Sequence, residues 1–432
     1  MKHGLLKLAL VSLTMMATPA LAETVAISDA KLVIGDGSAP IDGATIVMKN
    51  GRIVAAGQGV NVPAGARRID AGGKYVTPGI FAGFSRVGLV EVGAVSETND
   101  SRASGSQFSA ALDVADAINS DAKGIAVNRA AGVTRALVAP STGDNIFAGI
   151  GAVIDLGQDM QPIMKRGAFQ FVEMGERGSS RAGGSRTATY ALFRAMLNEA
   201  RRFGQSRANY NQEILSRADA EALQSVISGK TKLVVHAESA SDILRVIKLR
   251  KDFPKLDIVL VGAAEGWRVA PQIAAAKIPV LASAMNSLPE SFEMLASTQS
   301  SIGRMKRAGV TLGIAMINDR DAHQLRYTPQ YAGNMVAISK VPGATGLSWD
   351  EAFAAITSGP AKVMGLDGEI GSLKAGRRAD VVIWDGDPLE LSSSPLMVMI
   401  DGVEQSLSNR QIRLRDRYVT PNEGVLPKAY EY

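Results

Sequence analysis

The sequence contains no cysteine among its 432 residues, and only three histidines. Without thiols the chain forms no disulfides, carries no lipid on a cysteine and has no cysteine nucleophile. Its stability must therefore come from a packed core, and a hydrophobic share of 46% is enough to build a large one. The length allows one barrel-sized domain with an appendage, or two ordinary domains.

Patterns that mark several other classes of protein are also missing. There is no Gly-x-Ser-x-Gly elbow and no His-Glu-x-x-His helix, and Gly143, Gly149 and Gly151 do not form a phosphate loop. The formal net charge is +5, but the basic residues are scattered rather than gathered with aromatic residues. This distribution argues against nucleic acid as a partner.

The first 22 residues have the pattern of a secretory signal. A basic start is followed by the apolar run LALVSLTMMATPALA, which ends in Ala20-Leu21-Ala22. A membrane anchor is the alternative, but this run contains Ser12 and Pro19 and is shorter than the roughly 18 residues that a spanning helix needs. The pattern predicts cleavage before Glu23 and an exported, periplasmic protein that has no membrane attachment after cleavage.

Short β-branched runs alternate with turn residues near both ends of the chain. Between residues 24 and 76, Asn50-Gly51 separates two such runs and is typical of a type I′ hairpin turn. Similar runs return at 381–384 and 397–403. Neither group has enough strands to bury a face alone, so we expect the two ends to complete one β unit.

Between these ends, apolar runs alternate with amphipathic stretches, which indicates βα units and a parallel sheet. The region is long enough for an eight-stranded barrel, typically about 250 residues. Residues 173–185, rich in Gly, Ser and Arg, are predicted to form a long mobile loop. The expected strands are 134–138, 152–155, 169–172, 232–235, 257–261, 280–282 and 310–316, and the expected helices are 188–203, 218–227, 240–251, 268–276 and 349–356.

Five segments in this order resemble the amidohydrolase superfamily, and in particular its exported, imidazolonepropionase-related branch. They are AGGKYVTPG at 71–79, AGVT at 131–134, VHAE at 235–238, TSGPA at 357–361 and GSLKAGRRADVVIWDGDP at 371–388. The resemblance implies an α/β fold, a (β/α)8 TIM-like barrel with a β-sandwich built from both termini. It predicts a signal peptide at 1–22, β-sandwich parts at 23–76 and at 366–432, the latter including a tail, and the barrel at 77–365.

The resemblance also implies metal-assisted hydrolysis of carbon–nitrogen bonds, with metals held at the C-terminal mouth of the barrel. In the family, a His-x-His pair after the first strand supplies the first two ligands. Phe84 and Arg86 occupy those positions here. A phenyl ring has no lone pair and a guanidinium has no acceptor, so neither can coordinate a cation.

The remaining family positions yield a partial set of ligands. His236 matches the histidine after the fifth strand, Glu173 a bridging ligand after the fourth, and Glu265 is the one possible ligand after the sixth. Asp319 matches the catalytic aspartate after the eighth strand, although Asn318 is an alternative match. We therefore predict His236 and Asp319 as catalytic residues, and a metal site of Glu173, His236, Glu265 and Asp319, or no metal at all.

Carboxylates would favour Mg²⁺, Ca²⁺ or Mn²⁺ over zinc, so we expect at most one divalent cation and no binuclear zinc centre.

His236 is either a ligand or base, or a histidine retained by hydrogen bonds; His323 is expected in a loop or helix cap. Arg86 either neutralises the acids that once faced metal or binds a substrate carboxylate.

The sequence thus predicts a hydrolase of amide-type carbon–nitrogen bonds, with a small-molecule substrate. The alternative is an inactive barrel that binds a ligand or a partner protein. The sequence is compatible with a homo-oligomer as well as with a monomer.

Overall fold

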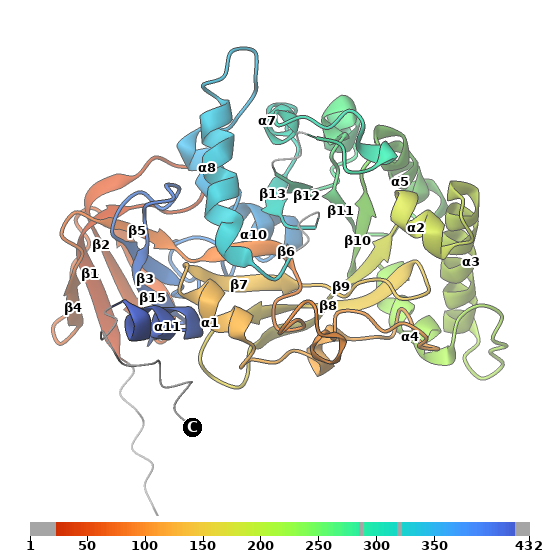
Figure 1. Ribbon diagram of the computed structural model, residues 1–432, viewed down its shortest axis with the longest axis horizontal. Helices are drawn as coiled ribbons and strands as arrows, with labels where there is room; N and C mark the ends of the chain where they lie inside the picture. Colours follow the sequence, from red (N-terminus) through yellow and green to blue (C-terminus); the bar gives the residue numbers. More distant parts are fainter. Residues whose placement is uncertain (1–22, 285–287, 318–321, 420–432) are drawn as a thin grey trace, which may run out of the picture.

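The computed structural model describes residues 23–284, 288–317 and 322–419, and contains two eight-stranded sheets. One sheet lies at one end of the molecule and gathers strands from both ends of the chain, while the second runs through the centre and carries most of the helices (Figure 1). No helix in the described ranges is long and apolar enough to cross a membrane.

The terminal sheet has the strand order β16-β15-β14-β5-β1-β2-β3, with β4 beside β1. The two ends of the chain meet where β5 pairs with β14, with Val76 opposite Ile383. The predicted joining of the two β-rich ends is therefore confirmed. The strands are β1 Thr24–Leu32, β2 Ile41–Lys49, β3 Arg52–Gly57, β4 Arg67–Asp70, β5 Tyr75–Pro78, β14 Val381–Trp384, β15 Pro395–Ile400 and β16 Val403–Gln405.

The predicted hairpin joins β2 to β3. Asn50 and Gly51 have φ values of 54° and 70°, as a type I′ turn requires. A Cβ on Gly51 would lie 2.8 Å from the carbonyl oxygen of Asp401, so the same glycine also lets the C-terminal strands approach.

The central sheet forms the barrel, in the strand order β13-β12-β11-β10-β9-β8-β7-β6, and β6 also contacts β13 so that the sheet nearly closes. The expected parallel strand at 152–155 is wrong in direction, because β8 runs antiparallel to both β7 and β9. The strands are β6 Ile80–Ser85, β7 Val133–Val138, β8 Phe147–Asp155, β9 Ile163–Glu173, β10 Lys232–Ala237, β11 Ile258–Gly262, β12 Val280–Ser283 and β13 Leu312–Ala315.

Several helices of the described chain begin at a polar side-chain cap. Ser216 and Ser239 cap α4 and α5, and Ser348 forms a capping box with Glu351 at α9. The α-helices are α1 Lys123–Arg129, α2 Gly175–Arg181, α3 Arg186–Gln205, α4 Arg217–Ile227, α5 Ala240–Asp252, α6 Ala270–Ala275, α7 Ser301–Arg307, α8 Thr328–Ile338, α9 Trp349–Ala354, α10 Ser358–Met364 and α11 Arg410–Tyr418. Short 3-10 helices are η1 Ser96–Thr98, η2 Val114–Asp116, η3 Gly266–Val269, η4 Phe292–Met294 and η5 Leu325–Tyr327.

The predicted long loop at 173–185 is wrong, because most of it is helix α2. Gly178 lets this helix approach the end of β9, since a Cβ there would lie 2.3 Å from the carbonyl oxygen of Glu173. Ser179 further ties the helix by donating to the carbonyl oxygen of Gly175 at 2.6 Å. Tertiary packing thus overrides the low helix propensity of the glycines and serines.

A buried ion cluster joins the two sheets. Arg135 on β7 is 1% exposed and makes two hydrogen bonds to Asp380 at 2.8 and 2.9 Å. It also contacts Asp401 at 2.8 Å and Asp155 at 3.4 Å. Asp380 and Asp401 flank β14 and β15, so one guanidinium holds the barrel against the terminal sheet.

Candidate functional site

The carboxyl ends of the parallel barrel strands bring three predicted site residues to one mouth. Glu173 ends β9, His236 lies near the end of β10, and Arg86 directly follows β6. His236 and Glu173 are paired across the two strands, so their side chains start side by side. In (β/α)8 barrels this end carries the residues that do chemistry.

His236 lies between two carboxylates. Its Nδ1 bonds to Glu173, and its Nε2 lies 2.7 Å from Oε1 of Glu238. All three side chains are almost wholly buried, at no more than 3% exposed. We call these three residues the His236 cluster.

The His236 cluster fixes the protonation state of the imidazole. Burial would lower the pKa of His236, but the charges and hydrogen bonds of Glu173 and Glu238 outweigh it and raise the pKa to about 10. Against its own burial, the pKa of Glu173 is held below its usual value by His236, Arg177 and Arg86. At neutral pH the ring is therefore an imidazolium that donates from both nitrogens.

These residues do not fit the metal that the family resemblance implies. A doubly donating imidazolium has no lone pair for a cation. Glu265 accepts from the backbone N–H groups of Ala240 and Ala296 at 3.0 and 2.9 Å, so both of its oxygens organise loops. No group of three or more His, Asp or Glu within residues 23–284, 288–317 and 322–419 could hold a metal ion.

Phe84 and Arg86, at the positions that the sequence resemblance assigns to the family's first two ligands, place a ring and a cation at the end of β6. Phe84 is fully buried and packs edge to face on Phe171 at 5.2 Å between ring centroids. The guanidinium of Arg86 lies 5.6 Å from the centroid of the Phe84 ring. Burial lowers the pKa of Arg86 to about 10, which leaves it charged at neutral pH.

Asp319, the predicted catalytic aspartate, and its alternative Asn318 lie outside the described residues. His323 lies in a loop before η5, where its carbonyl oxygen accepts from the side chain of Asn128 at 2.7 Å.

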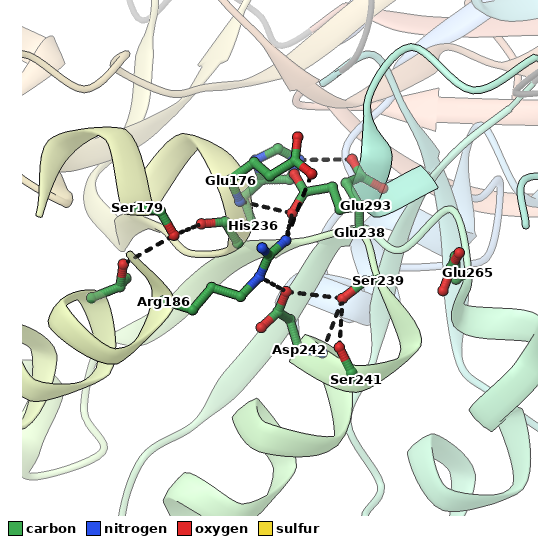
Figure 2. A network of polar contacts seen from close by, with 12 residues as sticks. Glu176, Ser179, Arg186, His236, Glu238, Ser239, Ser241, Asp242, Glu265 and Glu293 are labelled. Atoms are coloured by element: carbon green, nitrogen blue, oxygen red, sulfur yellow. Dashed lines mark hydrogen bonds and ion pairs between the residues drawn. The ribbon is translucent and has the colours of Figure 1, made fainter. Parts of the chain in front are cut away.

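A second network beside the His236 cluster was not predicted. Glu293, from the loop after β12, accepts from the backbone N–H of Glu176 at 2.8 Å and contacts Arg186 at 3.3 Å. Arg186 also binds Asp242 at 2.8 Å, so it links the loop to α5, and Figure 2 shows it between the two carboxylates. Burial raises the pKa of Glu293. One faint signal in the sequence is Gly175, two residues after the end of β9.

The comparisons with known proteins agree with the fold. The sequence model described as Amidohydrolase family matches residues 335–404. Imidazolonepropionase from Maricaulis maris (strain MCS10) is 28% identical over 390 residues, which cover 82% of this chain and 90% of that protein. A 60-residue segment, 14% of this chain and 6% of the relative's length, is 43% identical to amidohydrolase tasK from Hapsidospora irregularis.

Among solved structures, an amidohydrolase from Thermotoga maritima MSB8 superposes with a TM-score of 0.77. The match covers 89% of this chain and 100% of that one, at 23% sequence identity, and shows the shared fold. Together with the similarity to imidazolonepropionase along 82% of this chain, these findings support an amidohydrolase-superfamily, imidazolonepropionase-related protein.

Proposed function

We propose that the chain hydrolyses an amide-type carbon–nitrogen bond of a small molecule, and that the reaction takes place at the barrel mouth without a binuclear zinc centre. The observation that carries the proposal is a pair of cations, the buried His236 and the partly buried Arg86, at two positions that the sequence resemblance assigns to metal ligands. Similarity to imidazolonepropionase over 90% of that protein's length supports the reaction class.

Positive charge at the mouth is what such a reaction needs. When water attacks an amide carbonyl, negative charge develops on the oxygen, and fixed cations in a water-poor site stabilise it. Arg86 and His236 would supply that charge through the field they create, because the N–H groups of His236 are already bonded to carboxylates. Asp319 would act as the general base.

Variants of both residues test this mechanism. The purified protein is assayed against N-acyl amino acids, dipeptides and cyclic amides, with and without a chelator. We expect activity to survive chelation and to fall by about 100-fold or more in His236→Asn and in Asp319→Asn, the usual scale for one acid–base or electrostatic group. Full activity in both variants, or two equivalents of zinc by elemental analysis, would contradict the proposal.

A second candidate function is ligand binding without turnover. The observation that favours it is the closed state of the His236 cluster, in which both ring nitrogens already have carboxylate partners. Absence of hydrolysis with divalent metals supplied, together with calorimetric binding of the same compounds, would select this function.

We also propose export to the periplasm with cleavage before Glu23. Mass spectrometry of the protein isolated from periplasmic and cytoplasmic fractions tests it. A periplasmic chain that starts at Glu23 is the expected result, and a chain of full mass in the cytoplasm would contradict it.

A further inference from the structure

Among the residues that the structure describes, the side chain of Arg86 has no hydrogen-bond or ion-pair partner. Its backbone N–H donates to the carbonyl oxygen of Ala322 at 3.1 Å, which fixes the residue at the end of β6. Its side-chain Nε is buried and has no hydrogen-bond partner, and among the described residues no carboxylate forms an ion pair with the guanidinium. The residue as a whole is only partly buried, so part of its surface stays accessible to solvent.

The acids nearest to Arg86 are already engaged. Glu173 is bonded to His236 and lies 3.9 Å from the guanidinium of Arg177, and it reaches Arg86 only through a longer-range attraction. Glu238 is bonded to His236 and accepts from the backbone N–H of Ala264 at 2.8 Å. The sequence left two roles open for Arg86, and one of them was to neutralise acids at the predicted metal site. Among the described residues His236 takes this role, because it is bonded to both Glu173 and Glu238.

A guanidinium in this state is suited to bind an anion. It presents planar N–H donors in the fork that matches a carboxylate, and bonds of this kind are about twice as strong as neutral ones. A guanidinium that is partly removed from water and has no close counter-charge among the described residues is stabilised when it binds an anion. The guanidinium carbon of Arg86 lies over the ring of Phe84, which adds a cation–π contact.

We propose that Arg86 binds a carboxylate of the ligand, which narrows the ligand class to small amide-type molecules that also carry a carboxylate, such as N-acyl amino acids and dipeptides. The inference rests on the proposed function for the place and the amide character of the ligand. It does not require that the amide bond is hydrolysed.

Matched pairs of compounds test the inference. Each N-acetyl amino acid is compared with its C-terminal amide, which keeps the N-acetyl bond and removes the carboxylate, and binding to the full chain is measured by calorimetry. We expect the acids to bind about tenfold or more tighter than the amides, the usual scale for a charge-assisted bond. Arg86→Met should bring the acids to the level of the amides, and Arg86→Lys should keep part of the preference.

Arg194→Met is the matched control, because Arg194 is an exposed arginine on α3 paired with Asp252. It should leave the preference unchanged. Arg86→Met removes a cation that has no ion-pair partner in the described part of the chain, so the melting temperature of the variant should not fall. If this variant does not fold, Arg86→Lys carries the test. Equal binding of acids and amides, a preference that survives in Arg86→Met, or binding of neither compound would overturn the inference. A preference for acids without any hydrolysis would instead contradict the proposed function alone.

Discussion

His236, which the sequence resemblance predicted as a metal ligand, has the surroundings of a buried cation. The two carboxylates on its nitrogens keep it protonated. A proton held this firmly does not leave near neutral pH, so the ring cannot act as a general base there. His236 therefore contributes a fixed positive charge to the barrel mouth.

The protonation of His236 predicts how stability depends on pH. In the unfolded chain the ring loses its proton near pH 6.5, while in the folded chain it keeps it up to about pH 10. The contribution is therefore fully present below pH 6.5 and is lost as pH rises towards 10. We expect the free energy of unfolding to fall by roughly 1 to 3 kcal/mol from about pH 7 to about pH 9, measured by urea titration.

His236→Gln is the control for this pH dependence, because it removes the titrating group and keeps a hydrogen-bonding side chain. The fall should shrink in that variant. An unchanged slope would mean that other groups cause it.

At the scale of elements, the loop after β12 is tied across the mouth. Its 3-10 helix η4 turns Glu293 inward to α2 and Arg186, while Phe292 is 83% exposed on the other side. Gly175 makes this approach possible: its φ is +63°, and a Cβ there would lie 2.2 Å from Oε2 of Glu293. The loop and α2 therefore depend on each other.

Gly175→Ala should break this tie. The new methyl group displaces the Glu293 carboxylate and strains a left-handed backbone, so we expect a loss of stability of roughly 1 to 3 kcal/mol. Amide hydrogen exchange should become faster in residues 288–300. Gly183→Ala has the same kind of backbone strain, with φ +90°, but its Cβ meets no atom within 4 Å. If amide hydrogen exchange in residues 288–300 is equally fast in the two variants, the contact at Gly175 does not hold the loop to α2.

At the scale of the whole molecule, the Arg135 cluster makes the terminal sheet and the barrel one unit. Arg135→Met leaves the buried carboxylate of Asp380 and the partly exposed carboxylate of Asp401 without their shared cation. Breaking a buried ion pair from one side costs about 3 to 5 kcal/mol, which is a large part of the stability of an ordinary domain. Denaturant unfolding followed by far-UV circular dichroism should show this loss and a less cooperative transition.

Arg67→Met is the control, since Arg67 pairs with Glu404 on the exposed surface of the terminal sheet. Exposed pairs contribute at most about 1 kcal/mol, so the transition should stay close to that of the unchanged chain. If the two variants unfold alike, Arg135 does not join the two sheets energetically.

Local pattern was enough to predict much of the fold. The Asn50-Gly51 turn depends on the φ preferences of two adjacent residues, and strands such as β10 are continuous apolar runs between polar segments. The placement of His236 at a strand end follows from the same run. The prediction that Phe84 and Arg86 cannot coordinate a metal likewise follows from side-chain chemistry and needs no structure.

Only the tertiary structure decided what depends on residues far apart in the sequence. An apolar run such as 152–155 does not specify the direction of its neighbours, so the antiparallel β8 emerged only from pairing with β7 and β9. Helix α2 exists because Gly178 packs on the end of β9, against its local propensity. The charge of His236 depends on Glu173, 63 residues away, and the partner of Arg135 lies 245 residues away. Sequence pattern carries short-range preferences, whereas burial and charge pairing are set by which segments meet in the folded chain.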